Sequence, residues 1–392
     1  MIFVDKPFVS DFLKKTIADN GFPVVLTDRA KELGFGAAQS AIDEESAIKK
    51  ILSSKNLSLY TTSENAIGWI AKHLSATGLP GKIELFKDKA KFRALIKPLF
   101  PDFYFQEVSL AELDDLFCED LPMPFIIKPT TGFFSMGVYK VSSPKEWPQV
   151  KRALHAEIGS VKALYPKEVL DTTTFIIEQC IEGEEFAVDA YYDAGGEPVV
   201  LGIYKHIFSS KEDVSDRVYM TSKEIIETNL ESFSGFLKDI GTLAEVQNFP
   251  VHVEIRRDDS GKIIPIEINP MRFGGWCSTA DMTCVAYGFN PYVYYFSQRR
   301  PNWKALLKNK EGKLYSIIVL DNSTGVDAQH INAFDFGQLL SRFEHPLELR
   351  KIDYKAYPVF GFLFAETSQA NFCELERILT SDLKEFITDG RV

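Results

Sequence analysis

Along the first 85 residues of the chain, the spacing of apolar residues alternates between two patterns. Three short apolar runs are typical of strands (residues 2–5, 23–28 and 57–61), and three longer segments have the apolar spacing of helices (residues 10–21, 41–53 and 63–74). Ser10 and Ser63 occupy positions where a helix N-cap is expected, and Gly21 stands where the first helix should end. This alternation predicts a small parallel α/β domain over residues 1–85.

From residue 86 the pattern changes to one helix followed by many strands separated by turns. The expected strands are residues 124–129, 137–143, 174–181, 185–193, 197–208, 250–257 and 262–270, and residues 223–246 are expected to be helical. Strands that follow one another through turns predict antiparallel sheets, and therefore an α+β domain over residues 86–300. The remaining extension, residues 301–392, contains two strand-like runs, 315–321 and 359–367, and a closing helix.

The composition is that of a globular protein of enzyme size. A length of 392 residues allows two or three domains, and 45% hydrophobic with 25% charged residues excludes a disordered or fibrous chain. The net charge of −11 argues against a general nucleic-acid or membrane binder, because both need a basic face. No apolar run approaches the ~18 residues of a membrane span, and no basic signal-peptide region precedes residue 5, so we expect a cytoplasmic protein. Five cysteines without a CxxC pair indicate neither a disulfide framework nor a thiolate zinc site.

The most informative stretch is VHVEIRRDDSGKIIPIEINP, residues 251–270. Because alternate residues of a strand share a face, His252 and Glu254 share one face of the first strand, and Glu267 and Asn269 share one face of the second. A turn centred on the Ser-Gly pair would place Glu254 directly across from Glu267.

Two facing carboxylates repel each other unless a cation lies between them. With the amide oxygen of Asn269 they form an all-oxygen set suited to Mg²⁺, which usually takes one or two carboxylates and completes its shell with phosphate oxygens and water. A solvated hairpin face neutralised by Arg256 or Lys262 explains the same residues equally well.

A segment with two glycines follows the apolar strand that ends in Lys128. In FIIKPTTGFFSMGVYKV, Gly132 and Gly137 bracket a turn whose backbone N–H groups could cradle phosphate oxygens, with the lysine supplying charge. The segment is not a P-loop, because GxxxxGK[ST] is absent and no helix follows. A plain hairpin loop is the alternative interpretation.

A third segment, IIEQCIEGEEFAVDA, places Glu178, Glu184 and Glu185 in an otherwise apolar strand, with Gly183 permitting a bend. A nucleoside site could use backbone groups here for the adenine edge and a carboxylate for the ribose hydroxyls. Surface acids around a turn between two strands are the alternative.

These three segments, in this order and after an Asp-Lys pair at a helix start, resemble the ATP-grasp superfamily over residues 86–276. The metal set and its spacing resemble those of D-alanine:D-alanine ligase and biotin carboxylase. The resemblance implies a two-lobed ATP-grasp fold with antiparallel sheets, in which residues 86–180 include the glycine-rich lid lobe and residues 181–300 form the metal and substrate lobe. Residues 1–85 resemble the α/β domain that precedes this fold in relatives.

The resemblance also implies roles for individual residues. Lys89 and Lys128 would contact the phosphates of ATP, and the segment from Gly132 through Ser135 to Gly137 would cover them. Further nucleotide contacts would be Glu178 with the adenine amino group, Gln179 and Ile181 at the base-binding hinge, Glu185 with the ribose, and Lys205 or else His206 with phosphate. Glu254, Glu267 and Asn269 would bind Mg²⁺, with Mn²⁺ as an alternative.

One departure from the family pattern concerns the catalytic arginine. Many relatives have arginine two residues after the asparagine, but here that position is Met271 and Arg272 follows. Arg272 is either a catalytic residue together with Lys128 or a structural arginine. Residues 209–222 and 271–300, with Arg217, Arg299 and Arg300, are expected on the substrate side.

The reaction implied by the resemblance joins a small-molecule carboxylate to an amine, through an acyl phosphate formed at the expense of ATP. A small-molecule kinase and a non-catalytic ATP-binding module are the alternatives. The superfamily also leaves a homodimer open as the assembly state.

Overall fold

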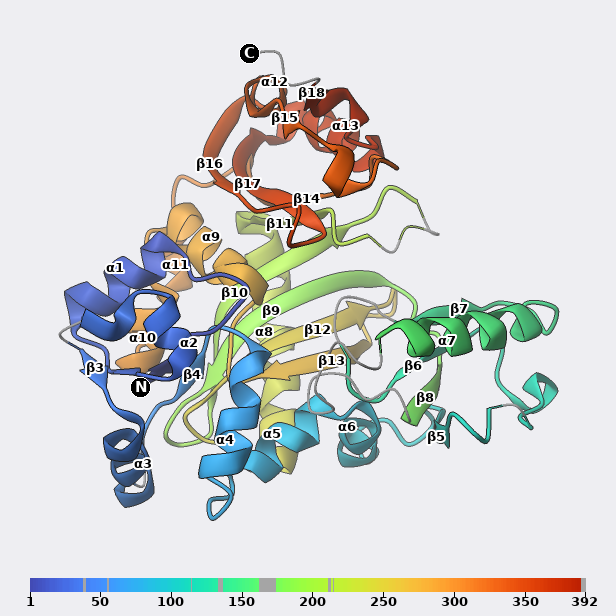
Figure 1. Ribbon diagram of the computed structural model, residues 1–392, viewed down its shortest axis with the longest axis horizontal. Coiled ribbons are helices and arrows are strands. Elements are labelled where there is room, and N and C mark those ends of the chain that lie inside the picture. The colour runs from blue at the N-terminus through green and yellow to red at the C-terminus, as the bar shows by residue number, and fades with distance from the viewer. Residues whose placement is uncertain are drawn as a thin grey trace.

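The computed structural model describes residues 1–37, 40–54, 56–113, 115–132, 137–161, 174–210, 213 and 215–388, with only the backbone for 157–161. An N-terminal α/β domain, a small sheet lobe and one long sheet follow each other along the chain (Figure 1). Ser135 of the predicted phosphate-covering segment lies outside the described residues. Within the described residues, no helix has both the length and the apolar character needed to cross a membrane.

The N-terminal domain is built on a parallel sheet, as predicted, and its strand order is β3-β2-β1-β4. The first helix begins after Ser10, whose Oγ accepts a hydrogen bond from the backbone N of Leu13 at 3.0 Å, and it ends at Gly21 with φ 60°. The elements are β1 (Ile2–Phe3), α1 (Asp11–Asn20), β2 (Val24–Val25), α2 (Asp28–Glu32), β3 (Ala41–Ile42), α3 (Glu44–Ser53), β4 (Tyr60–Thr61), α4 (Ile67–His73) and α5 (Leu79–Lys87). The helix expected from residue 41 starts at Glu44, because Asp43 caps it and the two residues before pair with β2.

The second lobe is a four-stranded antiparallel sheet with order β5-β8-β6-β7. Its elements are α6 (Lys89–Ile96), β5 (Phe105–Ser109), β6 (Phe125–Pro129), β7 (Tyr139–Val141), α7 (Trp147–Val161) and β8 (Thr174–Gln179). One face is apolar, and there Phe125 packs edge-on against Trp147 of α7 with ring centroids 5.5 Å apart. Strand alternation therefore turns Lys128 and Glu178 to the opposite face.

The third part is one eight-stranded antiparallel sheet with order β13-β12-β9-β10-β11-β14-β17-β16. Its elements up to residue 306 are β9 (Glu184–Tyr192), β10 (Pro198–Ile207), β11 (Val218–Ser222), α8 (Lys223–Ala244), β12 (Phe249–Arg257), β13 (Ile263–Pro270), α9 (Ser278–Tyr287), α10 (Pro291–Phe296) and α11 (Trp303–Leu306). Ser222 caps α8, and the apolar stripe of this helix covers one face of the sheet through pairs such as Phe186 and Phe233.

The C-terminal extension continues the same sheet. Its elements are β14 (Lys313–Asp321), β15 (Ala333–Phe334), α12 (Phe336–Leu340), β16 (His345–Lys351), β17 (Val359–Ser368), α13 (Cys373–Thr380) and β18 (Ile387–Thr388). Strand β14 pairs with β11, so no sheet edge separates the extension from the preceding domain. The predicted boundaries at residues 85, 180 and 300 stay predictions: residue 85 lies within α5, and residue 180 lies between strands of different sheets.

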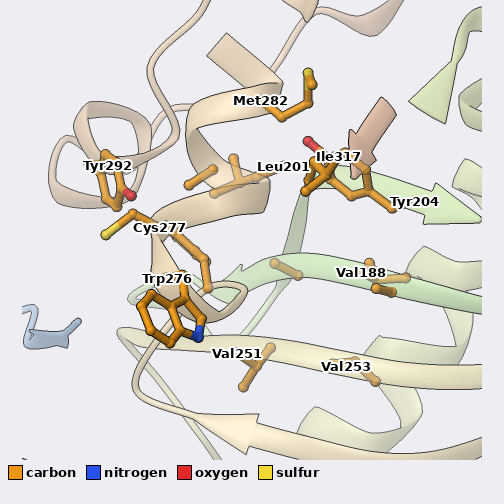
Figure 2. Packing of buried hydrophobic residues seen from close by; sticks show 14 of the residues in the cluster. Val188, Leu201, Tyr204, Val251, Val253, Trp276, Cys277, Met282, Tyr292 and Ile317 are labelled. Carbon is orange, nitrogen blue, oxygen red and sulfur yellow. The ribbon is translucent and has the colours of Figure 1, made fainter. Parts of the chain in front are cut away.

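The core joins the large sheet to the helices around it. Val188, Val251 and Val253 share the sheet face that α8 covers, whereas Asp189 and His252 lie on the other face, toward α9; the three valines are almost fully buried (Figure 2). This packed layer holds the central strands in place, and the alternate residues on the opposite face of these strands form the candidate site.

A pair of glycines in α8 provides a matched test of this packing. A Cβ on Gly241 would lie 2.2 Å from Cε1 of buried Tyr192, whereas a Cβ on Gly235 would meet nothing within 4 Å. We expect Gly241→Ala to lower the free energy of unfolding by about 1–3 kcal/mol through overpacking. Gly235→Ala should raise it by about 0.5–1 kcal/mol through helix propensity. Chemical denaturation of both variants checks the opposite signs, and two equal effects would contradict the packing described.

Candidate functional site

The hairpin of β12 and β13 brings the predicted carboxylates together. Glu254 pairs with Glu267 across the two strands, and His252 pairs with Asn269 on the same face, as predicted. The turn itself differs from the prediction, because the hairpin closes from the backbone N of Asp258 to the carbonyl of Lys262 at 3.0 Å. A β-bulge after Glu254 shifts the register by one residue and restores the facing pair.

The two carboxylates have different electrostatic surroundings. Oε2 of Glu267 lies 2.9 Å from Nζ of Lys89, and this contact, against the opposing effect of burial, holds the pKa of Glu267 well below its usual range. Burial and the neighbouring charges of Glu267 and Glu185 raise the pKa of Glu254 well above its usual range. Among the described side chains, the basic group within 4 Å of Glu254 is His252, with Nε2 3.8 Å away. Glu254 is therefore the carboxylate that a further cation would stabilise most.

Lys89 reaches Glu267 from the first turn of α6. Asp88 caps this helix by accepting from the backbone N of Ala90 at 2.9 Å, so the Asp-Lys pair stands at a helix start, as predicted. The backbone N of Lys89 donates to the carbonyl of Thr130 at 2.8 Å, which ties the helix start to the chain just after β6. The two predicted phosphate-binding elements are thus joined through their backbones.

Lys128 and Glu178 form a buried ion network on the inner face of the small sheet. Nζ of Lys128 lies 2.5 Å from Oε1 of Glu178, and Nε of Arg93 lies 2.8 Å from the other carboxylate oxygen. Although burial opposes it, these two cations lower the pKa of Glu178 to about 2. Burial, with help from Lys89 and Arg93, lowers the pKa of Lys128 against the opposing effect of Glu178.

Arg93 was not predicted, although it lies one turn after Lys89 on α6 and its spacing from that lysine was a usable signal. Its Nη1 donates to the carbonyl of Pro265 in β13 at 2.7 Å, while its Nε binds Glu178 in β8. Its guanidinium lies over the ring of Phe103 at 4.5 Å from the centroid. One side chain therefore links the small sheet to the hairpin of β12 and β13, named the metal hairpin after its predicted ligands.

The residues of the predicted base-binding hinge lie at the exit of β8. The side-chain Oε1 of Gln179 accepts from the backbone N of Tyr104 at 2.9 Å, and the carbonyl of Ile181 accepts from Nη1 of Arg256 at 2.7 Å. Gly183 has φ 112°, and a Cβ there would lie 2.3 Å from the carbonyl oxygen of Arg257. Only glycine fits this bend.

Gly132 and Gly137 border the phosphate-covering segment predicted from the sequence. Gly132 is buried, directly after the lysine strand. Gly137 has φ 69°, and a Cβ there would lie 3.0 Å from Cγ of Pro129. The backbone therefore re-enters the sheet by a turn that favours glycine.

Glu185 and Lys205 lie on opposite faces of the large sheet. Strand register places Glu185 and His206 on the face of Glu254, where Nδ1 of His206 lies 2.9 Å from Oε1 of Glu185. Nε of Arg256 donates to the other carboxylate oxygen at 2.9 Å. Lys205 lies on the other face and pairs with Glu184, so of the two predicted alternatives His206 is the one that lies beside Glu185.

Arg272 forms an ion pair with a residue of the N-terminal domain that the sequence did not reveal. Its Nη2 lies 2.8 Å from Oε1 of Glu64, and the second oxygen of Glu64 binds Lys87. The positive φ of Met271, 67°, turns the chain out of β13 just before the arginine. Burial opposes ionisation of Glu64, but Lys87 and Arg272 lower its pKa to about 2.

The other predicted substrate-side arginines lie outside this cluster. Arg217 is buried against the C-terminal extension, where its Nε lies 2.7 Å from Asp321. Arg300 pairs with Asp193 at 2.6 Å on the surface, and the carbonyl of Arg299 accepts from Tyr191. The sequence could not separate these roles, because the arginines differ only in their tertiary partners.

His252 is held from behind by a buried aspartate. Nδ1 of His252 lies 2.7 Å from Oδ1 of Asp189, which also accepts from the backbone N of Gly274 at 2.9 Å. Thr279 donates to the other oxygen of Asp189 at 2.5 Å. The buried carboxylate of Asp189 therefore contacts both His252 of the metal hairpin and the residues that follow the hairpin.

The oxygen donors suit a hard cation that brings part of its own coordination shell. Among the described residues, no group of three or more His, Cys, Asp and Glu side chains could hold a metal alone. Glu254, Glu267 and Asn269 supply two carboxylates and one amide, and Nδ2 of Asn269 donates to Glu267 at 3.2 Å. Such a set fits Mg²⁺ together with phosphate oxygens and water.

Comparisons with known proteins agree with this architecture. The model of the ATP-grasp domain matches residues 121–280. No curated protein matches the chain.

Several solved structures have the same fold. An L-amino acid ligase from Bacillus licheniformis is similar over 96% of each chain, with 18% identity and a TM-score of 0.69. A carboxyaminoimidazole ribonucleotide synthase from Aspergillus clavatus, complexed with ATP, is similar over 98% of each chain, with 11% identity and a TM-score of 0.62. A biotin carboxylase from Campylobacter jejuni is similar over 94% of this chain and 87% of its own, with 12% identity and a TM-score of 0.60. The match identifies an ATP-grasp domain over residues 121–280, and the chain as a whole has the fold of these solved structures.

Proposed function

We propose that this chain is an ATP-dependent ligase that activates a small-molecule carboxylate as an acyl phosphate and joins it to an amine, with release of ADP and phosphate. The main support is the facing pair of Glu254 and Glu267, with Lys89 bound to one of them and Lys128 close enough to lower its pKa. A metal-bound triphosphate needs this combination, because the metal takes carboxylates and the lysines take phosphate oxygens. The cytoplasmic location and a homodimer stay predictions.

The residues present fit Mg²⁺, or Mn²⁺ in its place. Glu254, Glu267 and Asn269 would hold the ion, which when bound neutralises the phosphate charges. Their fit is supported by Glu254, whose raised pKa marks a carboxylate without a strong cationic partner among the described residues. Lys89 would then share Glu267 with the metal and turn toward the phosphates.

The nucleoside would lie between the small sheet and β9. Glu185 would bind the ribose hydroxyls, and backbone groups at Gln179 and Ile181 would contact the base. Both oxygens of Glu178 already accept from Lys128 and Arg93, and each has a second lone pair. Glu178 would therefore hold Lys128 in place as well as accept from the adenine amino group.

The chemistry requires positioned charge rather than a protein nucleophile. A carboxylate oxygen of the substrate attacks the γ-phosphorus, the bond from that phosphorus to the bridging oxygen breaks, and ADP leaves. The amine nitrogen then attacks the acyl carbon, phosphate leaves, and the nitrogen loses a proton. Lys89, Lys128 and Arg272 would stabilise the charge on the transferring phosphoryl group. Glu64 would keep the guanidinium of Arg272 oriented.

Hydroxylamine trapping tests the proposal directly. With Mg²⁺ and ATP, we expect one acid from a panel of amino and organic acids to give a hydroxamate, with equal release of ADP. Glu267→Ala should abolish both products while circular dichroism stays unchanged, because the metal loses a ligand. ADP release with a hydroxyl compound but no hydroxamate would point to a kinase instead. ATP binding without any turnover would point to a binding module and reject the ligase.

Two lysines of α6, one buried and one exposed, provide a matched test of the proposed phosphate contact. Lys89 is buried and faces Glu267, whereas Lys91 is exposed and pairs with Glu84. We expect Lys89→Met to lower kcat/KM for ATP about 100-fold, the usual loss when one transition-state contact is removed. Lys91→Met should leave kcat/KM within about twofold. Steady-state ADP release measures both, and equal losses would remove Lys89 from the proposed role.

The ion pairs of Glu64 predict a pH-dependent contribution to stability. The folded pKa of Glu64 is about 2 against 4.5 for the free group, so its stabilisation is complete above about pH 4.5 and is lost as the pH falls toward 2. At pH 7, Glu64→Gln should lower the free energy of unfolding by on the order of 3 kcal/mol. This difference should shrink below about pH 4.5. Glu45→Gln, an exposed carboxylate paired with Lys49, is the control and should change stability by less than about 0.5 kcal/mol.

A further inference from the structure

The segment from Met271 to Cys277 leaves the metal hairpin in a strained conformation. Met271, Trp276 and Cys277 have φ of 67°, 58° and 55°, a region that side chains other than glycine rarely adopt. Such a conformation persists only where surrounding contacts impose it. The segment matters to the proposed ligase because it carries Arg272 and begins directly after the proposed metal ligands.

The first half of this segment is held by the N-terminal domain and by the large sheet. The carbonyl of Met271 accepts from the backbone N of Thr61 at 2.8 Å. The backbone N of Gly274 donates to Asp189 at 2.9 Å, and a Cβ on Gly274 would lie 2.2 Å from Oγ1 of Thr279. These contacts leave the conformation of Trp276 and Cys277 to be imposed from elsewhere.

The second half is held by Arg350 of β16, in the C-terminal extension. Nη1 of Arg350 donates to the carbonyls of Trp276 and Cys277, at 3.3 Å each. Its Nη2 lies 2.7 Å from Oδ2 of Asp281, one turn into α9. Trp276 and Cys277 stand at the start of this helix, next to the core strands (Figure 2).

Arg350 is itself rigidly held. It is 6% exposed, its Nε donates to Glu348 at 2.6 Å, and its guanidinium lies 4.4 Å from the ring centroid of Phe364. The ring of Phe8, from the N-terminal domain, lies 5.8 Å away on the same group. The planar guanidinium can bridge two carbonyls and a carboxylate at once, which a lysine ammonium on its flexible stem cannot reproduce.

We propose that Arg350 is a positioning residue of the ligase. It fixes the carbonyls of Trp276 and Cys277, and through them the substrate-side segment that presents Arg272. The C-terminal extension is thereby part of the active-site architecture. This inference rests on the proposed function for its catalytic consequence, whereas its structural part stands on the contacts alone.

Three variants of the full-length chain test this role. Arg350→Met removes all the contacts, and Arg350→Lys keeps one charged contact to Asp281 but cannot bridge both carbonyls. Arg217→Met is the matched control, because Arg217 is equally buried and ties the same extension to the sheet through the carbonyls of Ile378 and Ser381 without touching the segment.

The first measurement is amide hydrogen exchange, read by mass spectrometry on peptides that cover residues 271–281. We expect exchange to be at least tenfold faster in Arg350→Met than in the wild type, with the hairpin of β12 and β13 unchanged. The control should show no local change. Unchanged exchange at residues 271–281 in both Arg350 variants would overturn the proposal, whether or not the chain turns over ATP.

The second measurement is steady-state kinetics with the acid that the wild type converts to a hydroxamate. Both Arg350 variants should raise KM for that acid at least tenfold and leave KM for ATP within about twofold. A merely structural role would lower kcat with the folded fraction and leave both KM values unchanged, as we expect for Arg217→Met, and that result would overturn the proposal. Absence of hydroxamate from the wild type would instead reject the proposed function, and the exchange data would still decide whether Arg350 holds the segment.

Discussion

The facing pair of carboxylates, Glu254 and Glu267, is the constraint on which the rest of the candidate site depends. The register of the hairpin places the two carboxylates opposite each other. A shift of one residue would separate them, but it would also turn the buried face of the strand outward. Lys89 neutralises one of the two, and it can do so because the cap of α6 and the bond to Thr130 fix where its helix begins. The second carboxylate has no such partner among the described residues, and its raised pKa favours the protonated form unless a cation binds there.

The neighbouring buried carboxylates are also neutralised by cations. Arg93 and Lys128 share Glu178, and Lys87 and Arg272 share Glu64, so in both groups two cations surround one carboxylate. Buried pairs contribute little net stability, because desolvation offsets most of the attraction. Under the proposed function, they would hold cations where negative charge develops during phosphoryl transfer.

Three parts of the chain meet at the segment that leaves the metal hairpin. The N-terminal domain binds its start through Thr61 and Glu64, the large sheet binds its middle through Asp189, and the C-terminal extension binds its end through Arg350. Because strained backbone needs external support, the separate elements of the fold become one functional unit there. Contacts from three parts of the chain therefore support the backbone that follows the predicted metal ligands.

The sequence alone was enough to predict the α/β start, most strands of the central sheets, and the face shared by His252, Glu254, Glu267 and Asn269. Those features depend on local periodicity, which side-chain alternation encodes directly. Strands β5, β11 and β16 were missed, and so were the two-residue strands β15 and β18. Only the tertiary structure decided that a bulge rather than the turn sets the carboxylate register, that His206 and not Lys205 faces the site, and which arginines reach it. Each of these depends on contacts between residues far apart in the chain, and the identity of a charged side chain does not encode its partner.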